Sequence, residues 1–151
     1  MVKTFACSFT ATDIDAREGI AGIVSRLRAL GVPGKRADEV QIALTEAVNN
    51  VVEHAYAGTT PGDVTIDCKL HAERLYVSIR DAGGPYPGGR LPEGKAADVN
   101  VPHTDLPEGG FGWFLIRELA SQIEYERTGG GNNLSLCFEI KVSGQPASAR
   151  N

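Results

Sequence analysis

Hydrophobic residues follow two kinds of spacing along this chain. Apolar and polar residues alternate in short segments, which predicts strands at about residues 3–10, 64–70, 75–81, 123–128 and 134–142. Apolar residues recur every three or four positions in longer segments, which predicts helices at about residues 13–30, 36–56 and 110–122. Strands with one apolar face need helices to cover that face. The pattern therefore predicts an α/β (α+β) two-layer sandwich, with a mixed or antiparallel sheet and helices on one side.

The composition is that of one ordinary globular domain. The chain has 151 residues, of which 42% are hydrophobic and 23% are charged. A net charge of −4 without a Lys/Arg block argues against direct binding to nucleic acid. We find neither an apolar run long enough for a membrane span nor a secretory signal, and we expect a cytoplasmic protein without a membrane partner. Cys7, Cys68 and Cys137 stand far apart, which favours reduced thiols in strands over a disulfide framework or a zinc site.

The spacing of turn residues divides the chain into a domain, an internal loop and a tail. A single domain is predicted for residues 1–142, followed by a flexible tail at 143–151. Residues 82–109 contain most of the chain's eight prolines and many glycines. Loops longer than about 12–15 residues are uncommon in compact domains, where they are usually lids, binding loops or disordered segments. We therefore expect a long loop before the third predicted helix.

The second predicted helix carries polar residues at a spacing of four. On a helical wheel Glu46, Asn50 and His54 form a ribbon beside the apolar stripe, because residues four apart lie on one face. His54 borders the core, and Glu46 points furthest into solvent or a cleft. An ordinary solvated face would look similar, so the ribbon indicates a site only together with other features.

Asp81 is a second candidate. It falls in phase with Leu75, Val77 and Ile79, so it points from the end of a predicted strand toward the apolar face. A buried carboxylate is costly unless a hydrogen-bond donor binds it. The alternative is an aspartate that only caps the turn into Gly83.

Glycines at the start of the third predicted helix are a third candidate. In EGGFGWFLIREL, residues 108–119, Gly109, Gly110 and Gly112 leave backbone N–H groups bare at the positive end of a helix, which suits phosphate. A tight turn would also explain them. The spacings GxGxxG and GxxxxGK[ST] of the commonest nucleotide-binding loops are absent.

The order of these segments is more specific than any one of them. EAVNNVVEHAY, DAGGPY and GGFGWFLI resemble the N box and the two glycine boxes of the GHKL ATPase superfamily, which has the histidine-kinase-like, Bergerat-type ATP-binding fold. Over residues 5–142 the chain is most similar to the anti-sigma-factor serine/threonine kinases, and YERTGGGNNL is also typical of that subgroup. Pro85 follows Gly84 where much of the superfamily has DxGxG, a departure that occurs in this subgroup and narrows the assignment.

The resemblance implies ATP and Mg²⁺ as cofactors and a role for each candidate. Asn50 would hold Mg²⁺, and Glu46 would orient or deprotonate the attacking hydroxyl. Asp81 would accept a hydrogen bond from the adenine amino group, and Gly83 would let the backbone pass close to the base. His54 would either support a residue that touches the nucleotide or pack at the edge of the core. Gly109, Gly110 and Gly112 would face the phosphates. Residues from about 88 to 108 would form a lid over the nucleotide.

The resemblance also implies a function. We expect an ATP-dependent serine/threonine protein kinase that acts as an anti-sigma regulatory factor: it would phosphorylate a small antagonist protein of the anti-anti-sigma type and sequester a sigma factor or a similar regulator. An ATP-gated protein-binding module without kinase activity and a slow ATPase switch remain alternatives. The first predicted helix, with Arg17, could form a docking or homodimer surface, although a solvated arginine would look the same.

Overall fold

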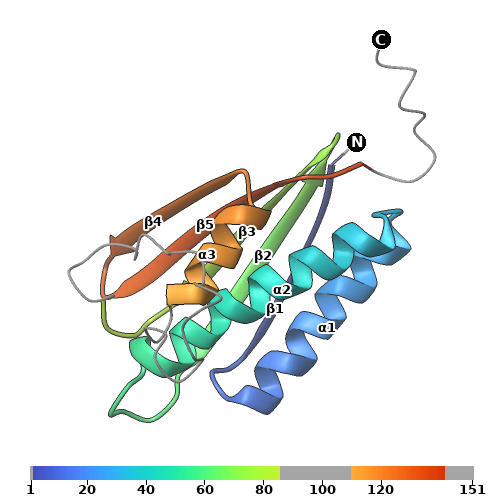
Figure 1. Cartoon of the computed structure of the whole chain (residues 1–151). Helices are drawn as coiled ribbons and strands as arrows, with labels where there is room; N and C mark the ends of the chain where they lie inside the picture. The colour runs from blue at the N-terminus through green and yellow to red at the C-terminus, as the bar shows by residue number, and fades with distance from the viewer. Residues whose placement is uncertain (1, 86–109, 142–151) are drawn as a thin grey trace, which may run out of the picture.

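The computed structural model of the chain describes residues 2–85 and 110–141. Five strands form an antiparallel sheet in the order β1-β2-β3-β5-β4, and the helices lie together on one face of it (Figure 1). This arrangement confirms the predicted two-layer sandwich and shows that the sheet is antiparallel rather than mixed. In chain order the elements are β1 (Val2–Thr10), α1 (Asp13–Ala29), α2 (Gly34–Asn50), the π-helix η1 (Val51–Ala55), β2 (Asp63–His71), β3 (Arg74–Asp81), α3 (Gly110–Leu119), β4 (Gln122–Thr128) and β5 (Gly131–Glu139).

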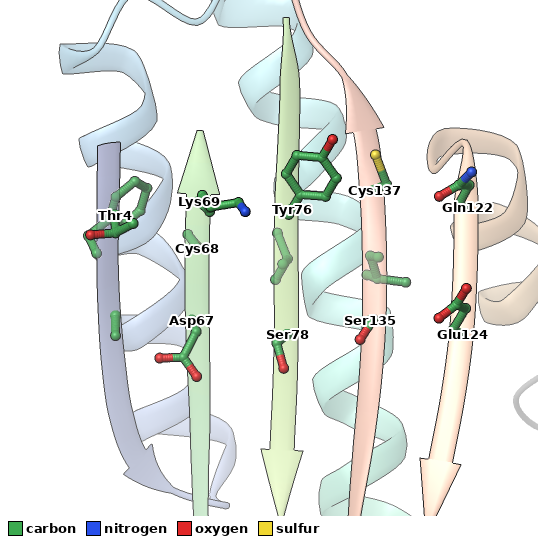
Figure 2. A pocket seen from close by; sticks show the side chains of 14 residues that line it. Thr4, Asp67, Cys68, Lys69, Tyr76, Ser78, Gln122, Glu124, Ser135 and Cys137 are labelled. Atoms are coloured by element: carbon green, nitrogen blue, oxygen red, sulfur yellow. The ribbon is translucent and has the colours of Figure 1, made fainter. Parts of the chain in front are cut away.

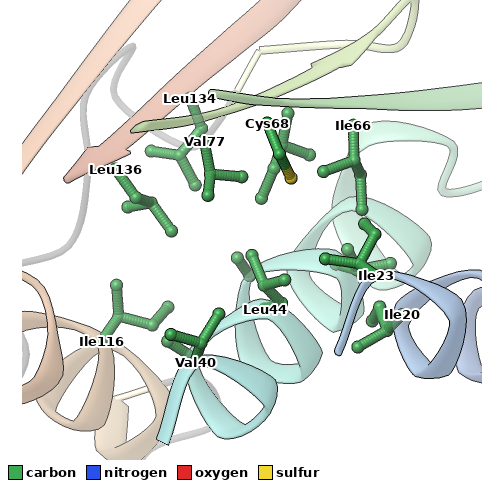
Figure 3. Packing of buried hydrophobic residues seen from close by; sticks show 14 of the residues in the cluster. Ile20, Ile23, Val40, Leu44, Ile66, Cys68, Val77, Ile116, Leu134 and Leu136 are labelled. Carbon is green, nitrogen blue, oxygen red and sulfur yellow. The ribbon is translucent and has the colours of Figure 1, made fainter. Parts of the chain in front are cut away.

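The hydrophobic core lies between the sheet and the helices. Helix α2 is central to it: Leu44 is fully buried and faces alternate residues of the strands, while α1 and α3 pack on either side (Figure 3). In β2 every second residue is buried, as a strand with one covered face requires. Residues from three helices and three strands meet in this core: Ile20, Ile23, Val40, Leu44, Ile66, Cys68, Val77, Ile116, Leu134 and Leu136.

The ends of α1 follow the sequence signals. The Thr12 hydroxyl accepts a hydrogen bond from the Asp15 N–H at 3.2 Å, which caps the first turn. After the last turn Gly31 has a φ of +97°, a conformation that glycine adopts without strain. The Val32 N–H then bonds the Leu27 carbonyl, so α1 ends where the predicted Gly-Pro stop lies.

Arg36, in the first turn of α2, connects three elements. Its guanidinium donates to the Leu119 carbonyl at the end of α3 and to the Glu139 carbonyl at the end of β5. It also lies over the ring of Phe138. These contacts fix the third helix end at Leu119, three residues before the predicted end, and β4 already begins at Gln122.

The structure bears on the predictions about the three cysteines and about membrane spans. Cys7, Cys68 and Cys137 are free thiols in β1, β2 and β5, as predicted. Among residues 2–85 and 110–141, no helix has the length and apolar character needed to cross a membrane. The predicted lid at 88–108 and the predicted tail at 143–151 fall outside the described residues.

The second predicted helix is not one uniform α-helix. It is α-helical from Gly34 to Asn50 and then continues as the π-helix η1 to Ala55. A π turn holds more residues than an α turn, so a wheel of constant step does not describe residues after Asn50. π turns of this kind are often found at functional sites.

The end of η1 is joined directly to the segment after β3. The Ala55 carbonyl accepts a hydrogen bond from the Gly84 N–H at 2.7 Å. The Tyr56 hydroxyl donates to the Asp63 carbonyl at 2.8 Å and accepts from the Ala82 N–H at 2.9 Å. A side chain at Gly83 would place its Cβ 2.3 Å from the Ala55 oxygen, so only glycine fits there. The helical layer and the end of β3 therefore approach each other backbone to backbone.

We predict that Gly83→Ala lowers the free energy of unfolding by about 1–3 kcal/mol, because the added methyl group would press on a backbone carbonyl that cannot move freely. The matched control is Gly22→Ala in α1, where nothing lies within 4 Å of the new Cβ. That change should raise the free energy of unfolding by about 0.4–1 kcal/mol. Urea unfolding of both variants checks the pair, and equal effects would contradict the close approach.

Candidate functional site

The structure brings the three candidate segments of the sequence to one end of the helical layer. Asp81 ends β3, Glu46 and Asn50 lie in the last turns of α2, and Gly112 lies in the first turn of α3. Gly83 connects the end of β3 to η1 through its contact with Ala55. The three segments that carry these residues are thus neighbours on the helix-covered face of the sheet.

The two oxygens of the Asp81 carboxylate have different surroundings. Oδ1 accepts from the Gly83 N–H at 2.8 Å and from the Asn132 Nδ2 at 2.9 Å. Oδ2 is buried and has no hydrogen-bond partner among residues 2–85 and 110–141. Both sequence interpretations hold, one for each oxygen: Oδ1 caps the turn into Gly83, and Oδ2 points inward. A buried acceptor without a donor costs about 1–3 kcal/mol of stability. Such an oxygen does not stabilise the fold, and a ligand that donates to it would remove the cost.

Asn132, which the sequence analysis did not single out, holds Asp81 in place. It is the first inward-facing residue of β5 and is 3% exposed. Its Nδ2 donates to Asp81 and to the Gly84 carbonyl at 2.8 Å, and its Oδ1 accepts from the Tyr125 hydroxyl at 2.5 Å. The signal that could have found it is its phase with Leu134 and Leu136, which places a polar amide on the apolar face.

Asn50 is the buried member of the polar ribbon on α2, with 6% of its surface exposed. Its Nδ2 donates to the Glu46 carbonyl one turn earlier at 2.7 Å. Because a carbonyl oxygen can only accept, this contact fixes the orientation of the amide. The Oδ1 atom is therefore the one that a cation or another donor would reach.

The Glu46 carboxylate lies half-buried where α2 meets α3. Burial raises the pKa of Glu46, and the negative charge of Glu53 raises it further. A Cβ atom at Gly112 would lie 2.5 Å from Glu46 Oε1, so the missing side chain at 112 gives the carboxylate room. Gly110 begins α3, and Gly109 lies outside the described residues. Phosphate contacts by these three glycines stay a prediction.

His54 and Arg17 do not join this cluster. His54 lies in η1 with 36% of its side chain exposed, and its Nε2 is 3.9 Å from the Glu53 carboxylate. This intermediate burial leaves its expected place at the edge of the core a prediction. Arg17 is exposed on α1 and borders a groove between α1 and α2, together with Asn49 and Glu53.

A separate hollow of about 590 Å³ lies on the opposite, helix-free face of the sheet. Figure 2 shows polar side chains standing on this face, among them Asp67, Ser78 and Glu124. Lys69 lies over the Tyr76 ring, so part of this surface is occupied by contacts between its own side chains. Asp81 and the candidate residues of α2 belong to the other face, and this hollow is not part of their site.

Comparison with known protein families identifies the domain that carries these segments. The family described as "Histidine kinase-like ATPase domain" matches residues 9–138, a span that contains every element of the site. The chain belongs to this family. Within this histidine kinase-like ATPase domain, Glu46 and Asn50 lie in α2, Asp81 ends β3, and Gly110 and Gly112 lie at the start of α3.

Two curated relatives cover most of the domain. The serine-protein kinase RsbW of Bacillus cereus (strain ATCC 10987 / NRS 248) is 29% identical over 137 residues, or 87% of this chain and 83% of the relative. The protein of the same name from Bacillus mycoides (strain KBAB4) is 32% identical over 134 residues, or 85% of this chain and 81% of the relative. The similarity therefore extends along the whole ATPase domain rather than over one motif.

Solved structures share the fold. The RsbU and RsbW domains of Rv1364c from Mycobacterium tuberculosis superpose with a TM-score of 0.64 at 20% identity, covering 96% of this chain and 34% of that chain. This chain therefore spans about a third of that solved chain. The histidine kinase domain of the blue-light activated histidine kinase from Erythrobacter litoralis EL346 gives a TM-score of 0.53 at 16% identity, covering 83% of this chain and 61% of that chain.

We predict that Glu53→Gln lowers the pKa of Glu46 in the protein without nucleotide or Mg²⁺, because one nearby negative charge is removed. The pKa should stay above the ordinary value of 4.5, since burial is the larger cause and remains. Carbon-detected NMR titration of the glutamate carboxyls measures both. Glu18→Gln, an exposed change on α1, should leave the Glu46 pKa unchanged. A Glu46 pKa at the ordinary value in the unaltered protein would contradict the desolvated position of this carboxylate.

Proposed function

We propose that this chain is an ATP-dependent serine/threonine protein kinase that acts in the cytoplasm as an anti-sigma factor. It would phosphorylate a small antagonist protein and bind a sigma factor or a similar regulator. The serine-protein kinase RsbW relatives, which align over most of the chain, support this function. The observation on the molecule that supports it is the buried Oδ2 of Asp81, which has no donor in the described part of the chain and could accept from an amino group of a bound base.

Adenine fits the Asp81 carboxylate better than guanine. The exocyclic amino group of adenine is a hydrogen-bond donor, whereas the corresponding position of guanine carries an oxygen that can only accept. Two donors already surround Oδ1, so Oδ2 is the free acceptor. An adenine amino group at Oδ2 would remove the cost of the unpaired oxygen.

Asn50 and Glu46 fit the phosphate end of the same nucleotide. Asn50 Oδ1 would bind Mg²⁺, which takes few protein ligands and keeps several waters. When bound, the ion neutralises charge on the phosphates. Glu46 would accept the proton of the attacking serine or threonine hydroxyl. Its raised pKa makes it a stronger base than an exposed glutamate, which suits that step.

We predict that Asp81→Asn weakens ATP binding and shifts the preference toward inosine triphosphate. The Gly83 N–H and the Asn132 amide both donate toward the Oδ1 position, so the amide oxygen of the variant is held there. Its NH₂ group then takes the place of Oδ2 and faces the adenine amino group, donor to donor, but it can donate to the O6 of inosine. Calorimetry with both nucleotides measures the shift. Unchanged ATP affinity and an unchanged ratio would contradict the adenine role.

Glu46 and Asn50 should fail in different ways when changed. In Glu46→Gln, ATP affinity should stay within a few-fold while phosphoryl transfer falls by about 100- to 10,000-fold, because the base is lost. In Asn50→Ala, Mg²⁺-dependent ATP binding should weaken, and transfer should fall with it. The matched control is Asn49→Ala, a neighbouring amide that lines the groove toward α1.

The assay is transfer of labelled γ-phosphate to the candidate antagonist protein, run beside nucleotide-binding measurements on the same variants. If Glu46→Gln transfers phosphate at the unaltered rate, Glu46 is not the base. If the unaltered protein binds the antagonist and ATP but transfers no phosphate, the chain is an ATP-gated binding module and the kinase proposal is wrong.

A further inference from the structure

We propose that Asn132 is the positioning residue that holds the plane of the Asp81 carboxylate so that its second oxygen faces the base, and that it thereby sets selectivity for a purine with an amino group at C6. This inference rests on the proposed nucleotide function and goes beyond it. Asn132 does not need to touch the nucleotide to have this effect. It acts by holding Asp81 in one orientation.

The contacts of Asn132 determine its orientation without ambiguity. Its two amide hydrogens point to Asp81 Oδ1 and to the Gly84 carbonyl, at 2.9 and 2.8 Å. Both of those oxygens can only accept in these contacts, so the atom facing them must be nitrogen. The amide oxygen is on the other side, where the Tyr125 hydroxyl donates to it at 2.5 Å and an Arg127 nitrogen lies 3.3 Å away.

The same amide ties Asp81 to the segment that follows it. Gly84 also donates to the Ala55 carbonyl, and Arg127 donates to the Gly83 carbonyl. Asp81, Gly83 and Gly84 are therefore all connected to Asn132 or to its neighbour across the hairpin. A partial rotation of the Asp81 carboxylate out of its present plane would break the bond to Asn132 and leave one of the amide hydrogens without a partner.

The hairpin between β4 and β5 places Asn132 opposite Asp81. Gly129 and Gly130 occupy the turn with φ values of +52° and +90°, the conformation of a two-residue turn with two positive φ angles. In the resulting register Asn132 lies between Asp81 on β3 and Arg127 on β4. Because side chains alternate along a strand, the next residue, Asn133, points to the opposite face.

Without the Asn132 amide, Asp81 keeps only the Gly83 N–H of its two described donors. The carboxylate plane could then tilt about the Cβ–Cγ bond, because one donor restrains it less than two. The acceptor facing the base would no longer be held in one place. Selectivity for the amino group would fall, while contacts to ribose and phosphates would be unaffected.

The test compares two nucleotides that differ only in the amino group: ATP and the triphosphate of purine riboside, which lacks it. In the unaltered protein ATP should bind about 10- to 100-fold more tightly, as expected for one hydrogen bond to a charged acceptor. In Asn132→Ala this ratio should fall by about tenfold, and affinity for the purine riboside triphosphate should change little. The matched control is Asn133→Ala, which removes an amide that accepts from Ser78 at 2.7 Å and should leave the ratio unchanged.

A purely structural role would give a different result. If Asn132→Ala weakens binding of both triphosphates equally, Asn132 supports the fold and does not set selectivity, and the inference is wrong. If the unaltered protein binds both triphosphates equally, the adenine role of Asp81 is wrong, and so is the proposed function at this site. If the ratio is high and Asn132→Ala keeps it, only the role of Asn132 is excluded.

Asn132→Asp is a second, nearly isosteric variant that covers the case in which the alanine variant does not fold. The new carboxyl would face Asp81 and the Gly84 carbonyl, with Arg127 and the Tyr125 hydroxyl on its other side. When ionised it has no hydrogen to donate to Asp81, and repulsion between the two carboxylates disturbs the orientation. When protonated it donates one hydrogen bond and replaces the lost amide in part.

The ratio of ATP to purine riboside triphosphate affinity in Asn132→Asp should therefore be low at pH 8 and should rise as the pH is lowered toward 5.5. The unaltered protein and Asn133→Asp should show a constant ratio, because the triphosphate groups titrate alike in both ligands. Calorimetry at each pH gives the ratio, and circular dichroism gives the folded fraction. A ratio that stays at the unaltered value at every pH would overturn the proposal.

Discussion

The position of the site depends on one carbonyl group, that of Ala55. It lies at the end of η1, where a helix leaves its last carbonyls without intrahelical partners. The Gly84 N–H, just after the end of β3, donates to it, and the absent side chain of Gly83 allows the approach. This backbone contact brings the polar ribbon of α2 and the acidic end of β3 to one place. Neither element could form the site alone.

Both carboxylates of the site are partly removed from water, and neither arrangement favours stability. The pKa of Glu46 is higher in the folded protein than in the unfolded chain, so the folded protein favours the neutral carboxyl more than the unfolded chain does. Its ionisation therefore opposes folding, and its contribution to stability falls as the pH rises from its unfolded pKa through its folded pKa. Asp81 keeps one buried oxygen to which no described residue donates. Sites that bind ligands commonly carry such costs, and the well-packed core around Leu44 offsets them.

The apolar pattern alone was enough to predict the sandwich and the approximate limits of its strands and helices. The inward direction of Asp81 also followed from the pattern, because side-chain alternation in a strand is strict. Asn132 was missed because GGGNN has the composition of a turn, and the last strand was expected to begin only at Leu134. Asn132 belongs to β5 because it pairs with Asp81 of β3, 51 residues earlier, and no local pattern records that pairing. The end of α3 at Leu119 depends in the same way on the distant Arg36.

The π-helix η1 makes the length of this segment more important than its composition. A π turn corresponds to one residue inserted into an α-helix. Deleting a residue between Val51 and Ala55 would restore regular helical geometry but rotate everything after it by about 100°. Tyr56 would then lose both the Asp63 carbonyl and the Ala82 N–H that its hydroxyl now bridges. A substitution in η1 changes one side chain and leaves the backbone path intact. An insertion or deletion there would separate the polar ribbon of α2 from the acidic end of β3.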